Sequence, residues 1–304
     1  MIWCSGWELA SAVSSNGGLG LIGAGSMHPE TLRDHIRKTK VSTDKPFGVN
    51  VPLFYPELST IMEIIAEEKV QVVVTSAGSP KAWTSWLHEH GIKVIHVVAS
   101  SVFARKSEEA GVDAIVAEGF EAGGHNGRDE TTTLALIPIV REATSLPLIA
   151  AGGIACGKSM LAVMTLGAEG VQIGSRFAVS QESSAHPEFK KLVTELKEGD
   201  TQLMLKKLAP VRLIKNDFFK QVDDAEKAGA SAGQLSEILG RGRAKRGIFE
   251  GDMKEGELEI GQVSAMIDDI PSVETIMKNI ISDFEATRKK VSSDDNFKFN
   301  GLLV

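Results

Sequence analysis

The sequence predicts an α/β protein: a TIM-type (β/α)8 barrel that lacks its first strand in this chain and carries an inserted helical lid subdomain. Short runs rich in valine and isoleucine alternate with amphipathic stretches. The apolar runs show little polar alternation, which is typical of parallel strands buried on both faces. Successive runs begin about 20–30 residues apart, the spacing of a βα unit. Loops with the character of ligand-binding loops follow nearly every run, which favours a barrel over an open sheet.

Each predicted element has a local signal. Strands are predicted at residues 18–22, 47–51, 70–75, 93–98, 113–117, 147–151 and 170–174. Helices are predicted between them at residues 7–15, 29–39, 57–68, 80–90, 102–110, 134–144 and 158–166. Pro29 and Pro80 start two of these helices, because the fixed φ of proline suits the first turn. Gly91, Gly111 and Gly167 follow helix ends, where a left-handed residue is favoured.

A closed barrel of this kind needs eight strands, and the sequence predicts seven. Because the chain opens with four residues that run straight into the first helix, we expect the missing strand upstream of Met1. It would occupy about 15–25 further residues and end in a glycine pair.

The alternation of strands and helices stops after Arg176. Residues 186–265 are polar and are predicted to be helical, without a clear strand, and to form the lid or substrate subdomain. The barrel then comprises residues 1–185 and 266–291, with a long amphipathic helix at 271–290 that closes it. Residues 292–304 are predicted to be a flexible tail.

Composition narrows the class of protein. The net charge of −7 argues against a nucleic-acid partner, and the basic stretch 241–246 is interpreted as a solvated face. Cys4 and Cys156 form neither a disulfide framework nor a metal pattern. No apolar run is long enough to span a membrane and no secretory leader is evident, so we expect a cytoplasmic protein without a membrane partner. A homodimer is left open.

His125 is the candidate catalytic residue. It follows the predicted strand 113–117 within a glycine-rich loop that includes Gly123 and Gly124. In parallel α/β proteins the carboxyl ends of the strands hold the ligands, and an imidazole there moves protons near neutral pH. The alternative is a loop histidine without a role.

The last two predicted strands end in candidate phosphate loops. Gly152 and Gly153 follow one strand, and Gly174 and Ser175 follow the next. In an eight-stranded barrel this is the usual phosphate position, because backbone N–H groups and a helix N-terminus face the anion there. The alternative is a pair of tight turns without a ligand.

Polar residues also end the other predicted strands. Asn50, Ser76 and Glu118 would form a polar ring that suits a heteroaromatic ligand such as a flavin, with its phosphate at the late loops. His96 lies inside a strand, and we interpret it as a hydrogen-bonded core histidine.

The chain resembles the nitronate monooxygenases, formerly 2-nitropropane dioxygenases, and the related FMN-dependent enoyl-ACP reductase II enzymes. The matching stretches fall in family order and are residues 17–20, 46–50, 118–125, 150–154 and 174–177. Residues 210–216 and 261–262 are closer to the reductase branch. The motifs are specific for the superfamily and discriminate poorly between its activities.

The resemblance implies a barrel that holds FMN noncovalently, with His125 as the catalytic histidine. Five matched positions would contact the cofactor: Asn50, Glu118, Gly153, Gly174 and Ser175. Gly123 and Gly124 would line the flavin face. The family's Gln-Gly-Gly segment, which precedes the position of Met1, is absent from this chain.

The resemblance allows two reactions on a small-molecule substrate. A nitronate monooxygenase, the narrowly preferred reading, oxidises alkyl nitronates with O2 to carbonyl compounds and nitrite. An enoyl-ACP reductase uses NAD(P)H to reduce an enoyl thioester carried by an acyl carrier protein. A third interpretation is a nonenzymatic flavin-binding protein, against which the position of His125 argues.

Overall fold

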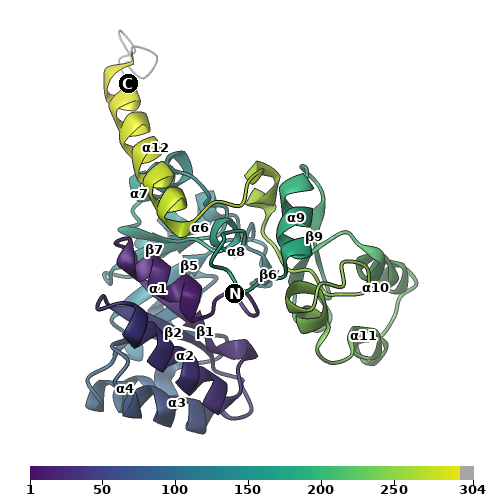
Figure 1. The fold of residues 1–304 in the computed structure, drawn as a ribbon, viewed down its shortest axis with the longest axis horizontal. Helices are drawn as coiled ribbons and strands as arrows, with labels where there is room; N and C mark the ends of the chain where they lie inside the picture. Colours follow the sequence, from purple (N-terminus) through teal and green to yellow (C-terminus); the bar gives the residue numbers. More distant parts are fainter. Residues whose placement is uncertain (295–304) are drawn as a thin grey trace.

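The computed structural model describes residues 1–294, in which a parallel sheet and its helices form one body and a smaller sheet with helices lies beside it (Figure 1). The parallel strands are β1 (Gly20–Gly23), β2 (Phe47–Pro52), β3 (Val72–Ser76), β4 (Lys93–Val98), β5 (Ala114–Glu118), β7 (Leu148–Ala151) and β8 (Gly170–Gln172). They pair in the order β1-β2-β3-β4-β5-β7-β8, so each strand joins the next parallel strand along the chain. This is the predicted TIM-type fold, and every predicted strand is found within two residues of its expected bounds.

The two edges of this sheet are β1 and β8. No strand of the described residues 1–294 pairs with either free edge. Strand β4 has the bounds that the sequence predicts, whereas β1 begins two residues later.

Helices cover the outer face of the barrel sheet. They are α1 (Trp7–Ser15), α2 (Pro29–Ser42), α3 (Leu58–Glu67), α4 (Thr84–Glu89), α5 (Ser101–Glu109), α6 (Thr133–Arg141) and α7 (Gly157–Thr165), with short 3-10 turns at η1 (Ala24–Ser26) and η2 (Pro80–Ala82). The main core lies between sheet and helices. Ile115 and its register partner Leu148 are fully buried there, in one cluster with Leu136 of α6. Burial of such side chains stabilises the fold by about 1.5–3 kcal/mol each.

The long helix α12 (Val273–Ser293) packs along α7, as Figure 1 shows at the end of the barrel body away from the smaller sheet. A Cβ on Gly157 would collide with the backbone of Phe284, so this close approach requires glycine. The predicted helix at 271–290 is therefore confirmed, but it extends to Ser293 and so overlaps the predicted tail. Residues 295–304 of that tail lie outside the described part of the chain.

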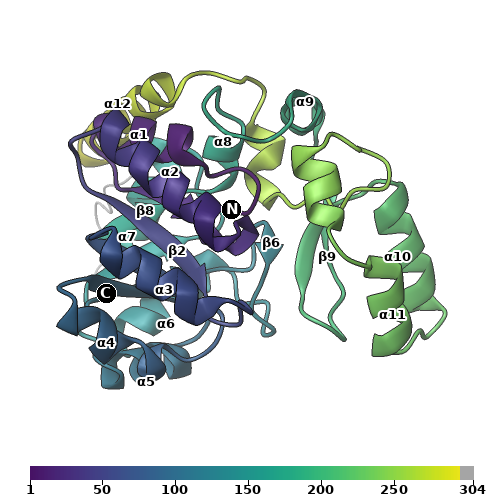
Figure 2. The same cartoon turned by 60° about the horizontal axis from the view of Figure 1, so that its bottom comes forward.

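The prediction that residues 186–265 contain no strand is wrong. Strands β9 (Thr201–Met204) and β10 (Val211–Ile214) pair antiparallel, and β10 also pairs with β6 (Gly124–His125), giving the order β6-β10-β9 (Figure 2). The remaining segments are α8 (Ser175–Ala178), α9 (Pro187–Glu195), α10 (Asp217–Lys227), α11 (Ala232–Leu239), the π-helix η3 (Lys245–Phe249) and the 3-10 helix η4 (Gln262–Met266). We call residues 186–265 the lid segment.

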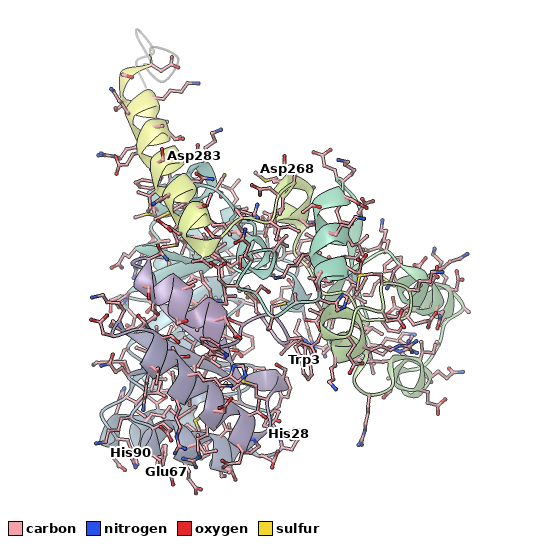
Figure 3. The ribbon with its side chains drawn as sticks, in the orientation of Figure 1. Trp3, His28, Glu67, His90, Asp268 and Asp283 are labelled. Atoms are coloured by element: carbon pink, nitrogen blue, oxygen red, sulfur yellow. The ribbon has the colours of Figure 1, made fainter. Side chains whose placement is uncertain are left out.

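The first five residues lie between the barrel body and the lid segment, where Figure 3 labels Trp3. The Trp3 ring packs against Phe249 with 5.6 Å between centroids. Ser184 donates a hydrogen bond to the Trp3 carbonyl at 3.1 Å, and Ser183 donates one to the Cys4 carbonyl at 3.2 Å. Within residues 1–294 no helix is both long enough and apolar enough to cross a membrane.

Candidate active site

Two of the predicted site residues meet at neighbouring strand ends. The Asn50 side-chain amide donates to the Val74 carbonyl at 2.9 Å and to the Ser76 hydroxyl at 3.3 Å. Asn50 and Val74 are register partners, so both side chains leave the sheet on one side. Val74 is absent from the core that the outer helices cover, whereas Val73 belongs to it. Asn50 and Ser76 therefore lie on the inner face of the barrel.

Glu118 ends β5 on the same inner face. Its register partner is Ala151, whose own partner is Gln172 at the end of β8. Burial raises the pKa of Glu118 to about 7, against the lowering effect of the Met1 amino group. A carboxyl with this pKa can both donate and accept a hydrogen bond near neutral pH. A small hollow opens beside it, lined by residues that include Ala99, Phe120 and Thr131.

Gln172 is a polar inner-face residue that sequence reasoning did not single out. Side chains alternate between the two faces of a strand, so every second residue of β8 lies on the inner face. Aligning the end of β8 with the end of β5, where Glu118 lies, would have identified Gln172 as one of them. Its side-chain amide adds a donor and an acceptor to the polar ring that Asn50, Ser76 and Glu118 begin.

His125 lies in strand β6 rather than in an irregular loop. It pairs with Val211 of β10, Gly124 pairs with Arg212, and the N–H of Asn126 donates to the Pro210 carbonyl at 2.9 Å. The side chain of His125 is exposed. The lid segment thus holds the backbone of the candidate catalytic residue and leaves its imidazole free to meet a substrate.

Arg212 is a second residue that sequence reasoning missed. It is 1% exposed, yet no carboxylate among the described residues pairs with it. Its guanidinium donates to the carbonyls of Phe120 and Ala122 at 2.7 and 3.2 Å, and stacks 4.4 Å from the Phe120 ring centroid. Burial lowers the pKa of Arg212, which remains a cation at neutral pH. This side chain fixes the loop that leads to His125.

The first candidate phosphate loop lies close to an acidic side chain. Gly152 and Gly153 have φ values of +88° and +71°, which glycine adopts without strain. A Cβ on Gly153 would lie 3.4 Å from Glu121 Cβ. The Glu121 carboxylate accepts hydrogen bonds from the Thr133 N–H and hydroxyl, both at 2.9 Å, and so caps helix α6.

The second candidate phosphate loop contacts the lid segment. Ser175 is the first residue of α8, and its hydroxyl accepts a hydrogen bond from the Gly261 N–H at 3.0 Å. A Cβ on Gly123 would collide with the backbone of Ile260 and Gly261. Gly261 thereby joins the His125 loop to the Ser175 loop. A Cβ on Gly174 would meet Met1 Sδ at 3.5 Å, an ordinary contact.

The predicted residues fit a flavin with a phosphate. The first N–H groups of α8 have no partner within their helix, and the Ser175 hydroxyl keeps its hydrogen free to donate. The φ values of Gly152 and Gly153 let backbone approach an anion closely. The inner-face side chains Asn50, Glu118 and Gln172 supply the donors and acceptors that a flavin ring edge needs.

His96 lies apart from this group. It shares its face with its register partner Ile115, so it points toward the outer helices, and it is 4% exposed. Its Nδ1 lies 2.7 Å from the Thr75 hydroxyl. Burial lowers the pKa of His96 to about 4. The structure therefore agrees with the interpretation of a hydrogen-bonded core histidine.

We expect His96 to make the protein acid-sensitive. In the unfolded chain a histidine takes up its proton near pH 6.5, and in the folded protein only near pH 4. The stability that neutral His96 contributes is thus present above pH 6.5 and is lost as the pH falls from 6.5 toward 4. Urea unfolding of His96→Gln should show a shallower decline over this window. The exposed His90→Gln variant is the control, and an unchanged slope in His96→Gln would contradict the assignment.

A family model described as nitronate monooxygenase matches residues 1–65 and 56–283. The chain belongs to the nitronate monooxygenase family. A probable nitronate monooxygenase of Staphylococcus aureus (strain JH9) is 32% identical over 90% of this chain and 90% of its own length.

Two further relatives carry other names. The structure of FabK from Thermotoga maritima is 42% identical, covers 96% of this chain and 93% of its own, and superposes with a TM-score of 0.91. A (3aS,4S,5R,7aS)-5-hydroxy-7a-methyl-1-oxo-octahydro-1H-indene-4-carboxyl-CoA dehydrogenase of Rhodococcus jostii (strain RHA1) is 28% identical, over 93% of this chain and 90% of its own length. The chain is thus an oxidoreductase of this family.

Proposed function

We propose that the protein is an FMN-dependent reductase of an enoyl thioester. The observation that carries the proposal is the Gly261 junction: its N–H donates to Ser175 at the candidate phosphate loop, and its backbone packs against Gly123, two residues before His125. One lid residue thereby links the candidate anion site to the candidate proton-transfer residue. This juxtaposition suits a cofactor phosphate held at one end and a substrate bound under the lid at the other.

The cofactor would be held by groups already described. The backbone N–H groups at Gly153, Gly174 and Ser175 would bind the phosphate. Asn50, Ser76, Glu118 and Gln172 would bind the ring edge from the inner face of the barrel. Gly123, Gly124 and Gly152 would line the cofactor closely without side chains of their own. When bound, FMN supplies hydride transfer between a nicotinamide and the substrate.

The chain supplies the proton. Reduction of an enoyl thioester adds one hydride and one proton across the carbon–carbon double bond, and NADH or NADPH provides the hydride. His125 would hydrogen-bond the thioester carbonyl and donate the proton, which solvent then replaces. Arg212 would keep the loop before His125 in place through the carbonyls of Phe120 and Ala122.

Two relatives support the choice of an enoyl thioester as substrate. The sequence by itself favours the nitronate reaction narrowly. The 42% identity with FabK, an enoyl-ACP reductase II, exceeds the 32% identity with the probable nitronate monooxygenase. The Rhodococcus relative is named for a carboxyl-CoA thioester. The family model keeps the nitronate as the second candidate, in which His125 would act as a base on the nitroalkane or hold its nitro group.

We expect the protein to bind one FMN per chain without a covalent bond. Heat denaturation of the purified yellow protein should release FMN into the supernatant, where chromatography identifies it. A Gly174→Leu variant should release much less, because Gly174 is the residue before α8 in the proposed phosphate loop and a bulky side chain there would crowd that loop. Release of FAD would contradict the cofactor assignment.

Two assays on the FMN-loaded protein decide the substrate. One follows NADH and NADPH oxidation with crotonyl-CoA under nitrogen, and the other follows O2 uptake with propionate 3-nitronate. Turnover in the first assay alone supports the reductase. Turnover in the second assay alone replaces it with the nitronate monooxygenase, and neither reaction in an FMN-loaded protein refutes both proposals.

A further inference from the structure

The segment around His125 is rich in glycine and contains little regular structure. Strand β6 has two residues, and within the described residues 1–294 it pairs with β10 alone. Gly124 has a φ of +72°, and Gly123 and Gly127 lie close to it in the chain. Glycine leaves the backbone more conformational freedom than any other residue. This segment therefore needs contacts beyond its strand pairing to hold one conformation.

The pairing of β6 with β10 ends directly after His125. There the Asn126 N–H donates to the Pro210 carbonyl at 2.9 Å. Proline has no N–H, so Pro210 cannot return a hydrogen bond to the Asn126 carbonyl. The backbone on this side of His125 is thus bound to the lid segment by one hydrogen bond, where a complete antiparallel pair makes two.

The side chain of Asn126 supplies two further hydrogen bonds to the same segment. Its Nδ2 donates to the Ala122 carbonyl at 2.9 Å and to the Gly124 carbonyl at 3.0 Å. The amide nitrogen is the only donor of an asparagine side chain, so two carbonyl partners determine which end of the amide faces them. The half-buried side chain therefore closes residues 122–126 into a compact loop.

Asn126 binds at both of the peptide groups that flank His125. The Gly124 carbonyl belongs to the peptide group before His125, and the Asn126 N–H belongs to the peptide group after it. The side chain of Asn126 holds the first group, and its backbone holds the second. Because each peptide group is planar, holding both planes fixes the φ and ψ of His125 and with them the direction of its Cα–Cβ bond.

The Ala122 carbonyl is shared between Asn126 and Arg212. Arg212 Nε donates to this oxygen at 3.2 Å, and Asn126 Nδ2 binds it as well. A carbonyl oxygen has two lone pairs, so it accepts both bonds. Arg212 also binds the Phe120 carbonyl, earlier in the chain. Asn126 instead binds the Gly124 carbonyl, next to the imidazole. The arginine thus holds the start of the loop, and the asparagine holds its end.

We propose that Asn126 is a positioning residue for His125: its side-chain amide fixes the backbone that carries the imidazole, and so directs the imidazole toward the substrate. For its consequence in catalysis this assignment rests on the proposed function. Misplacing a catalytic group by about 1 Å costs about 10²-fold in rate. Loss of the amide is therefore expected to lower the rate, while FMN content and the melting temperature stay unchanged.

The Asn126→Leu variant tests the amide, because leucine has a similar branched shape and no donor. On crotonyl-CoA or a nitroalkane, whichever is turned over, its rate should fall by between about 10-fold and 10²-fold. Asn16→Leu is the matched control. The Asn16 side chain also donates to a carbonyl four residues back, that of Ala12 at 2.9 Å. Asn16 precedes β1, at the opposite end of the barrel from the ligand loops, so this variant should keep the parent's rate.

A double-mutant cycle with His125→Ala shows whether Asn126 acts through the imidazole. Substitutions that act through one group are not additive. Asn126→Leu should therefore slow the parent, yet leave the residual rate of His125→Ala unchanged within about 2-fold. An equal fall in both backgrounds would assign Asn126 a general structural role and overturn the proposal. A rate of Asn126→Leu equal to that of the parent would overturn it too.

Amide hydrogen exchange of the FMN-loaded protein measures the same contact without turnover. In Asn126→Leu the backbone amides of residues 122–128 should exchange at least about 5-fold faster, because two hydrogen bonds that resist local opening are lost. The barrel strands should exchange as in the parent, and Asn16→Leu should leave residues 122–128 unchanged. Exchange at the parent's rate in Asn126→Leu would show that the amide does not hold the loop.

The exchange measurement also separates this inference from the proposed function. If neither substrate reacts, the proposed function fails, and the exchange rates still decide whether Asn126 holds the loop that carries His125. Faster exchange together with an unchanged rate would overturn the role of Asn126 in catalysis. If Asn126→Leu does not fold, Asn126→Ala is measured in the same way, with the same outcomes counting for and against the proposal.

Discussion

Replacing Arg212 with alanine is expected to lower the free energy of unfolding by about 3 kcal/mol or more. The guanidinium makes two hydrogen bonds to the carbonyls of Phe120 and Ala122, and bonds to a charged group contribute about 1.5–3 kcal/mol each. The stacked Phe120 ring would also lose its partner. The cost of burying the cation disappears in the variant and offsets part of this loss.

Urea unfolding of the Arg212→Ala variant measures the effect. Arg288→Ala is the control, because Arg288 pairs with Glu285 at the surface of α12 and should change stability by about 0.5 kcal/mol or less. The free energy of unfolding of Arg212→Lys should fall between those of the parent and Arg212→Ala, since a single ammonium group cannot reproduce the planar guanidinium fork. A stability of Arg212→Ala within about 1 kcal/mol of the parent would show that other contacts hold the loop.

Replacing His125 with alanine is expected to lower the rate of the proton-dependent reaction by at least about 10²-fold, because general acid–base groups contribute about 10²–10⁴-fold. The side chain is exposed, so its truncation leaves no buried cavity and the melting temperature should hold. FMN content should hold too, since the proposed cofactor contacts lie on other residues. The loss of rate in His125→Ala should be smaller on a preformed nitronate, because no proton has to be removed from that substrate.

The control for His125→Ala is His90→Ala, since Figure 3 places His90 on the side of the barrel away from the lid segment. That variant should keep the rate of the parent. Full activity of His125→Ala on both crotonyl-CoA and a nitroalkane would exclude the catalytic role. A fall in FMN content parallel to the fall in rate would instead assign His125 to cofactor binding.

The barrel strands were predictable because their signal is local. A parallel strand covered on both faces consists almost entirely of apolar residues, so its bounds can be read without knowing its neighbours. Strand β4 and helix α1 occur at the predicted residues. In the lid segment the same reasoning failed for β10, since Arg212 interrupts its apolar run. From the sequence alone an arginine is expected to be exposed, because the carbonyls that bind a buried arginine are not known.

The sequence by itself determined the barrel class, the order of its strands and the glycine-rich strand ends, because hydrophobic periodicity and backbone freedom act between near neighbours. Only the tertiary structure decided that β6 joins β10 and that Arg212 holds the loop before His125. Such pairings form between residues distant in the chain, as for Gly261 and Ser175, 86 positions apart. Their partners are selected by the packing of the lid segment on the barrel, which no local pattern contains.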